Sequence, residues 1–478
     1  MSQLTSPNYV HQFYVNGISG VGDFYDGAAW HTLLAGATGA GGKALFALDV
    51  TDPANFSASK VLWEFSNTVQ PVPTACSAWG SNTNYDVNDL GYTLGQPSVV
   101  RLSDGSWVVI AANGYNSANG HAVLFILDAK SGCVIKKIDT VSADTSGLAT
   151  VNGLSSPIAI DTNYDRITDA VYAGDLHGNL WKFDLSTAGS YPTPTAPFFI
   201  ACTTSGSCTA ANRQVITAKP TVGPVNGVGT DQNGVGWMVY FGTGQYFAPG
   251  DNVIGANPQV QSFYGLWDQG TSITDRSQLQ PQNITFQGVG TLACTLTNTC
   301  PTGTLTTTTN SITVVSNNAV CYATSSTGCT ATSPLKRGWV LDLIYTTAQG
   351  ERVVSAPLVT RGLVVFATLI PSANQCKAGG DSNLFEVGAL SGGQSAMAPF
   401  DINGDGVVNT QDQVLVNGVP QFVSGINLNI GIINTPTLIS ASTVDYKYVS
   451  GSTGAMAYVT DAGGGNSGAN KRSWRQLK

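Results

Sequence analysis

The segment from Asp401 to Asp412 carries oxygen-bearing side chains at a spacing that is typical of calcium sites. Counted from Asp401, these side chains stand at positions 1, 3 and 5, with glycine at position 6 and a carboxylate at position 12. Calcium takes about six to eight oxygen ligands, and alternate residues of a tight loop can all turn inward. A plain turn between strands is the alternative, but such turns seldom place an acid at position 12. The segment therefore predicts an EF-hand-type calcium loop with Asp in place of the usual final Glu. Its predicted ligands are Asp401, Asn403, Asp405, the Val407 carbonyl and Asp412.

A second Asp-rich segment, residues 161–169, has a similar but shorter pattern. Its oxygen ligands fall at positions 1, 3, 5 and 9, with a backbone carbonyl at position 7. Two residues depart from the pattern, because Arg166 stands where glycine is expected and Tyr172 stands at position 12. A solvated acidic turn is the alternative to a calcium loop here. The predicted ligands are Asp161, Asn163, Asp165, the Ile167 carbonyl and Asp169.

Residue types that perform catalysis are sparse in this chain. Its four histidines, His11, His31, His121 and His177, lie outside any zinc motif, and no Gly-x-Ser-x-Gly motif is present. Isolated histidines are more often structural than catalytic. We therefore expect no catalytic residue and no enzymatic activity.

The cysteines predict an exported protein with local disulfides. Cys202/Cys208, Cys294/Cys300 and Cys321/Cys329 are close pairs in Thr-, Ser- and Gly-rich segments without nearby histidine. Such pairs fit loop-closing disulfides better than zinc ligands or free buried thiols. The pairing of Cys76, Cys133 and Cys376 stays open. No signal peptide or membrane-spanning apolar run is visible, so we expect a fragment of a longer exported protein.

The composition favours short strands joined by many turns. The 478 residues are 42% hydrophobic but only 10% charged, and 55 of them are glycine. Typical soluble proteins have about 25% charged residues. The net charge is −8, and no basic stripe is present that would bind nucleic acid.

A degenerate unit of three strands recurs along the chain. Residues 96–102, 107–114 and 123–128 form its best copy, and residues 156–161, 170–175 and 180–184 form the next. About seven candidate closing strands can be counted in this way. Repeated strand groups of this kind favour a single β-propeller domain over residues 1–478, with a Thr- and Cys-rich insertion at residues 270–335. An array of unrelated β-sandwiches is the alternative.

Several stretches resemble the C-terminal domain of the PilY/PilC family of type IV pilus biogenesis factors and tip adhesins. The resemblance covers nearly the whole chain in the same order. The stretches are residues 41–53, 152–157, 172–184, 241–246 and 473–477, of which 176–184 is the most specific.

The resemblance implies a modified seven-bladed, all-β propeller whose calcium loop lies just before the Tyr172–Asp175 stretch. It further implies that calcium there regulates pilus extension and retraction, and with it twitching motility and surface adhesion. The implied partners are minor pilins at the pilus tip and host or abiotic surfaces. The implied location is the cell surface, after export through the periplasm and outer membrane.

Two other functions remain open from the sequence. Quinoprotein dehydrogenases are also calcium-containing propellers, but they often carry adjacent cysteines, which are absent here. A glycan-binding propeller without catalysis is the other alternative.

Overall fold

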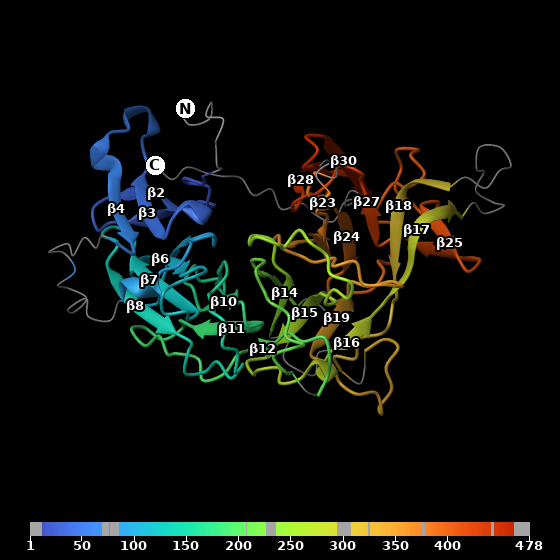
Figure 1. Ribbon diagram of the computed structural model, residues 1–478, viewed down its shortest axis with the longest axis horizontal. Helices are drawn as coiled ribbons and strands as arrows, with labels where there is room; N and C mark the ends of the chain where they lie inside the picture. The colour runs from blue at the N-terminus through green and yellow to red at the C-terminus, as the bar shows by residue number, and fades with distance from the viewer. Residues whose placement is uncertain are drawn as a thin grey trace. The chain divides into compact units, whose positions relative to one another are not determined.

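The computed structural model describes residues 12–68, 76, 86–206, 208–225, 236–293, 307–323, 326–374, 378–440 and 444–462. The chain divides into two compact units, which are described separately below (Figure 1). Unit 1 comprises Met1–Phe247, Gln261–Gln280 and Cys321–Gly338, and unit 2 comprises Ala248–Val260, Pro281–Val320 and Trp339–Lys478. Within the described ranges, no helix has the length and apolar character needed to cross a membrane. The short 3-10 helices are η2 (Gly39–Gly41), η3 (Pro53–Asn55), η4 (Ala58–Lys60), η6 (Val87–Asp89) and η8 (Arg276–Gln278).

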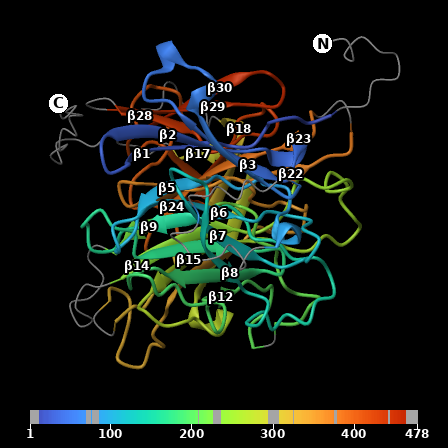
Figure 2. The same ribbon diagram turned by 90° about the vertical axis from the view of Figure 1, so that its left-hand side faces the viewer.

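Unit 1 is a series of antiparallel meanders in which each strand pairs with the next one along the chain. Three sheets have the orders β1-β2-β3-β4, β5-β6-β7-β8 and β12-β11-β10-β9 (Figure 1 and Figure 2). A four-stranded sheet of this kind is the repeating blade of a β-propeller. The strands of unit 1 are β1 (Gly20–Tyr25), β2 (Trp30–Ala37), β3 (Ala44–Asp49), β4 (Val61–Ser66), β5 (Ser98–Arg101), β6 (Trp107–Ala112), β7 (Val123–Asp128), β8 (Val134–Asp139), β9 (Ile158–Ile160), β10 (Ala170–Gly174), β11 (Asn179–Asp184), β12 (Phe199–Ile200), β13 (Thr221–Pro224), β14 (Trp237–Gly242) and β15 (Ser262–Asp268).

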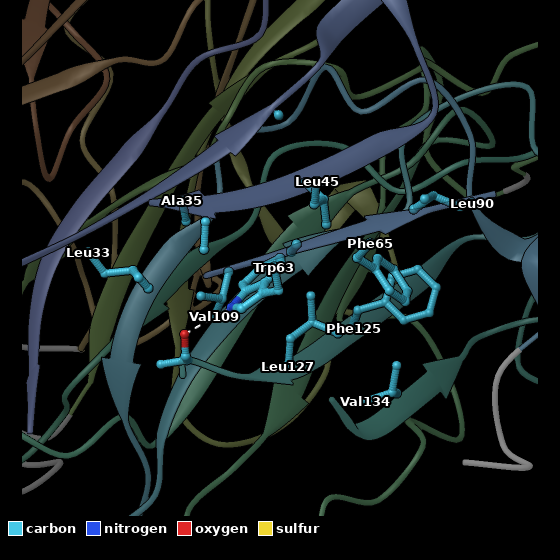
Figure 3. Packing of buried hydrophobic residues seen from close by; sticks show 14 of the residues in the cluster. Leu33, Ala35, Leu45, Trp63, Phe65, Leu90, Val109, Phe125, Leu127 and Val134 are labelled. Carbon is cyan, nitrogen blue, oxygen red and sulfur yellow. Dashed lines mark hydrogen bonds between the residues drawn. The ribbon is translucent and has the colours of Figure 1, made fainter. Parts of the chain in front are cut away.

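The core between the first two sheets shows why the apolar runs of the sequence become central strands. Side chains from both sheets interdigitate there, with Phe65 of β4 meeting Phe125 of β7 at a ring-centroid distance of 5.2 Å (Figure 3). The indole of Trp63 packs in this core and donates its Nε1 hydrogen to the Ala129 carbonyl over 3.0 Å. Strands buried on both faces lose the alternating pattern of a half-exposed sheet. Burial of this apolar surface is what holds neighbouring meanders together.

Unit 2 is less regular. A long sheet contains β20, β21, β24 and β27 in one run and continues through β18, β17, β25 and β26. The sheet β28-β29-β30 has three strands, and β22 pairs with β23 alone. The remaining strands, given with those of unit 2, are β16 (Gln280–Gln282), β17 (Ile284–Leu292), β18 (Thr307–Val315), β19 (Gly338–Asp342), β20 (Leu358–Thr360), β21 (Leu363–Ala367), β22 (Ile370–Pro371), β23 (Gly380–Asp381), β24 (Asn383–Gly388), β25 (Gln413–Val416), β26 (Val419–Phe422), β27 (Gly425–Asn427), β28 (Thr437–Ser440), β29 (Val444–Ser450) and β30 (Met456–Ala462).

The expected seven blades are not what the structure contains. Among the described residues, five sheets have four strands or more: the three meanders of unit 1, the sheet that begins with β13-β14-β15, and the long sheet of unit 2. They correspond to five blades. Counting closing strands assigns one blade to each. A sheet edge, however, has free hydrogen-bonding groups, and inserted strands can extend it. Strands β17 and β18, from the expected insertion at residues 270–335, join the long sheet of unit 2 in this way.

Two of the three predicted disulfides are confirmed. Cys202 is bonded to Cys208 and Cys321 to Cys329, with Cα–Cα distances of 5.8 and 5.7 Å. Cys294, Cys300 and Cys376 lie outside the described residues. The structure also pairs Cys76 with Cys133 across 57 positions of sequence. No local spacing signals a bridge of that length, so the sequence left this pairing open.

Candidate functional site

Both Asp-rich segments are loops between consecutive strands. The first loop, residues 161–169, joins β9 to β10 and is anchored by pairing of the Asp169 amide with the Ile160 carbonyl at 2.9 Å. The second loop, residues 401–412, lies between β24 and β25 and is flanked by the fully buried Phe400 and Val414. The tips of both loops are exposed, whereas their ends are fixed by strands or core side chains.

In the first loop, side-chain oxygens accept hydrogen bonds from the loop's own backbone. The Asp161 carboxylate accepts from the amides of Tyr164 at 2.6 Å and Arg166 at 2.7 Å. Further along, the Asp165 amide donates to Asn163 Oδ1 over 2.9 Å. The Ile167 amide donates to Asp165 Oδ1 over 2.8 Å. These bonds hold three of the predicted ligand residues around one tight turn.

The second loop repeats the same hydrogen bonds position by position. The Asp401 carboxylate accepts from the amides of Gly404 at 2.8 Å and Gly406 at 2.9 Å. The Asp405 amide donates to Asn403 Oδ1 at 2.9 Å, and the Val407 amide donates to Asp405 Oδ1 at 2.8 Å. Two loops in different units thus share one backbone design, although only the second has the glycines expected for it.

The backbone angles explain why Arg166 does not disrupt the design. Positions 4 and 6 of both loops have positive φ: +65° at Tyr164 and +69° at Arg166, against +75° at Gly404 and +81° at Gly406. Glycine adopts this left-handed conformation freely, whereas a residue with Cβ does so at a cost of about 1–2 kcal/mol. The first loop therefore keeps the calcium-loop geometry and bears local strain at two positions.

The two loops close differently. In the first, Asp169 at position 9 accepts from the Thr162 amide at 2.8 Å. In the second, Asp412 at position 12 accepts from the Ile402 amide at 3.0 Å. Each closing acid therefore binds the amide of position 2. Burial of Asp412, which is 1% exposed, raises its pKa to about 6, although hydrogen bonds from backbone amides oppose the shift.

The residues of both loops fit a hard cation by their chemistry. All of the predicted side-chain ligands are carboxylate or amide oxygens, the donors that calcium prefers. A cavity of about 170 Å³ lies against the second loop and is lined by Asp401, Asn403 and residues of β18 and β27. The three carboxylates of each loop do not all come within 4.8 Å of one another, because they point at backbone amides of the loop. A bound ion would draw these oxygens together.

One other group of metal-ligating side chains is closely spaced within the described residues. Ligand atoms of Asp89, His121 and Asp139 all lie within 4.8 Å of one another. Lys137 Nζ, however, is 2.8 Å from Asp89 Oδ2, and Asn119 donates to Asp89 Oδ1 over 2.8 Å. A cation is therefore already in place, and the group is best explained as a buried ion pair.

The sequence did not reveal a buried pair between His177 and Asp144. His177 Nδ1 lies 2.6 Å from Asp144 Oδ2, and the His177 side chain is 5% exposed. Burial alone would lower the pKa of His177, but its hydrogen bond to the Asp144 carboxylate raises it. The pair borders a cavity of about 250 Å³ that is lined by both polar and apolar residues of unit 1. Asp144 lies 33 residues from His177 in the sequence, so no local motif signals the contact.

Comparisons with known proteins agree with the fold. The family model described as the PilY1 beta-propeller domain matches residues 1–296. The crystal structure of the Pseudomonas aeruginosa PilY1 C-terminal domain matches with a TM-score of 0.71 and 30% sequence identity, covering 94% of this chain and 85% of that one. This match confirms the expected all-β propeller architecture.

Two curated relatives are similar along most of the chain. A type IV pilus biogenesis factor PilY1 homolog of Xylella fastidiosa is 36% identical over 410 residues, which is 82% of this chain and 24% of that protein. The type IV pilus biogenesis factor PilY1 of Pseudomonas aeruginosa is 33% identical over 452 residues, 89% of this chain and 35% of that protein. The chain thus spans about a quarter to a third of the length of these relatives. Together with the match of the family model to more than half of the residues, these similarities place the chain in the PilY1 family of type IV pilus biogenesis factors.

Proposed function

We propose that this chain is the calcium-binding propeller of a pilus-tip protein, in which calcium regulates pilus extension and retraction. The observation that carries the proposal is the shared hydrogen-bond design of the two loops. Asp161 and Asp401 each bind the amides of positions 4 and 6 in their loops. The same hydrogen-bond pattern occurs at two unrelated points of the chain. This repetition favours a common ligand over two turns that are alike by chance.

The first loop carries the regulatory part of the proposal. The loop is an exposed turn, whereas β10 and β11 of the same sheet are largely buried. Calcium can therefore order the loop without determining whether the sheet folds. Without an ion, its three carboxylates repel one another across one turn. Calcium would therefore distinguish an open from an ordered loop, and a ligand that distinguishes two states shifts their populations. Twitching motility and surface adhesion would follow this shift.

The proposed partners are minor pilins at the pilus tip, together with host or abiotic surfaces. The proposed location is the cell surface after export, which agrees with the disulfides that the structure contains. The role is structural and regulatory rather than enzymatic.

The test is an Asp165→Ala substitution in the full-length protein of the source bacterium. Asp165 lies at the exposed loop tip, so its replacement should remove a calcium ligand without disturbing the buried strands. We expect altered piliation and reduced twitching. Asp184→Ala is the matched control, because Asp184 is an exposed acid on the same sheet but outside the loop. Normal twitching in an Asp165→Ala strain whose protein has lost this calcium would refute the regulatory role.

A further inference from the structure

The tip of the first loop contacts a neighbouring sheet of the same unit. The loop joins β9 to β10, and the next sheet along the chain begins with β13-β14-β15. The ring of Tyr164 packs against the indole of Trp237, the first residue of β14, with a centroid distance of 5.7 Å and an angle of 51° between the rings. Aromatic pairs at such distances attract each other beyond the effect of their buried area. The loop is therefore attached to a sheet to which it does not belong.

Tyr164 stands at a position that favours glycine. It occupies position 4 of the loop, where its φ angle is +65°. The second loop has Gly404 at this position with a φ angle of +75°, and a Cβ atom added to Gly404 would have no described atom within 4 Å. A side chain in this left-handed conformation is unfavourable unless its surroundings compensate for the strain. The contact with Trp237 provides this compensation in the first loop, whereas a side chain in the second loop would have no neighbour.

Position 12 of the first loop also contacts the next sheet. Tyr172 stands there in place of an acid, and its hydroxyl donates a hydrogen bond to Asp268 of β15. Lys182 Nζ of β11 lies 2.5 Å from the same carboxylate oxygen, Asp268 Oδ2. Asp268 is buried, and it lies directly opposite Trp237 in the register of β14 and β15. A buried polar link that uses no predicted calcium ligand therefore joins the two sheets next to the aromatic contact.

The two contacts depend differently on the state of the loop. The link through Asp268 connects strand residues of β10, β11 and β15, so it persists whether the loop is ordered or open. Tyr164, by contrast, is 71% exposed at the loop tip, and its amide donates to the Asp161 carboxylate that holds the turn. An ordered loop therefore favours the contact with Trp237, and this contact must favour the ordered loop to the same extent.

We propose that Trp237 is a positioning residue of the first calcium site. It acts through Tyr164, whose ring it holds, and so stabilises the loop conformation that presents the predicted ligands. Calcium binding in the loop and the stability of the adjoining end of β14 are therefore coupled. This inference rests on the proposed calcium binding and adds to that site a residue from a neighbouring sheet.

Calorimetric titration of calcium tests the proposal in an Asp401→Ala background, where only the first loop is expected to bind. Tyr164→Ala keeps the Cβ atom but removes the ring, and it should weaken calcium binding by about three- to tenfold. Tyr164→Phe should retain the affinity of the parent protein. Trp237→Leu should weaken binding to the same extent as Tyr164→Ala. The double variant should show no further loss, because both substitutions remove the same contact.

Trp30→Ala is the matched control. Trp30 packs against Trp107 at a centroid distance of 5.4 Å, and Trp107 begins β6 as Trp237 begins β14, but this pair lies outside both loops. Its loss should leave calcium affinity unchanged. Hydrogen exchange at the amides of β14 gives a second readout, because calcium should slow it in the parent protein but not in Tyr164→Ala. Tyr164 is exposed, so its truncation leaves no buried cavity that would unfold the protein.

Unchanged calcium affinity in Tyr164→Ala would overturn the inference and leave the proposed calcium binding intact. Additive losses in the double variant would also overturn it, since Tyr164 and Trp237 would then act separately. If the Asp401→Ala protein bound no calcium, the proposed binding by the first loop would be wrong, and this inference with it.

Discussion

Replacing Arg166 by glycine should stabilise unit 1 by about 0.5–1 kcal/mol. The φ angle of Arg166 is +69°, and its side chain is exposed, so the substitution removes little packing. Relief of the left-handed strain is worth about 1–2 kcal/mol. Glycine adds conformational entropy to the unfolded chain, which costs about 0.5–1 kcal/mol. The difference is the expected net increase in the free energy of unfolding.

Urea unfolding in the presence of a chelator measures this effect without a contribution from bound metal. Arg166→Ala is the control, because it removes the same charge but keeps Cβ and should bring no gain. Gly406→Ala makes the opposite change at the equivalent position of the second loop, where φ is +81°, and should destabilise unit 2. Equal stabilisation by Arg166→Ala and Arg166→Gly would refute the strain argument and implicate the charge instead.

Arg166→Gly and Arg166→Ala also test whether the charge of Arg166 weakens calcium binding. Both substitutions remove a positive charge from a loop that is proposed to hold a divalent cation. Each should therefore raise calcium affinity, by about two- to fivefold at low salt, and the gain should shrink as salt screens the charge. Calorimetric titration at two ionic strengths measures it. Unchanged calcium affinity in both variants would indicate that calcium does not bind near Arg166.

Three further predictions concern the rest of the structure. Cys133→Ser removes a bridge that spans 57 positions and should lower the free energy of unfolding by about 4 kcal/mol in the loop-entropy model, as measured by urea unfolding of the oxidised proteins. The buried pair of His177 with Asp144 raises the pKa of His177, so its contribution to stability should be full below pH about 6.5 and lost as pH rises through the higher folded pKa. Unfolding across pH 6 to 9 should show this decline in the wild type and not in His177→Gln; equal slopes would contradict it. Lys447→Met leaves Glu386 and Asp461 buried without their cation and should lower the free energy of unfolding by about 3–5 kcal/mol. A loss under 1 kcal/mol in urea unfolding would argue against a stabilising role for these buried ion pairs.

Much of the fold could be predicted from local sequence. Apolar runs bounded by turn residues became β6, β7, β10 and β11, because strands buried on both faces need continuous apolar sequence. Cysteines six or eight positions apart could be paired for the same local reason. The oxygen-bearing residues of the two loops could also be identified from the sequence, because a tight turn is determined by residues that are neighbours in the chain.

Features that depend on distant contacts were not predictable. The number of blades depends on which strands join an existing edge, and β17 and β18 could not be assigned to the long sheet from their own residues. The orientation of β29 also depends on a distant residue. Lys447 faces inward, where it pairs with Glu386, 61 positions away in the sequence. The conformation of Arg166 could not be predicted either. Anchoring of the loop by β9 and β10 holds Arg166 at a positive φ angle, which a residue with a Cβ atom disfavours.

The number of calcium ions bound by the chain shows directly whether both loops bind calcium. Calorimetry together with elemental analysis of the dialysed protein measures this number. Asp161→Ala and Asp401→Ala each remove the carboxylate that binds two backbone amides of its loop. We expect two ions in the wild type, one in each single variant and none in the double variant. Two ions in either folded single variant, or none in the wild type at millimolar calcium, would contradict it.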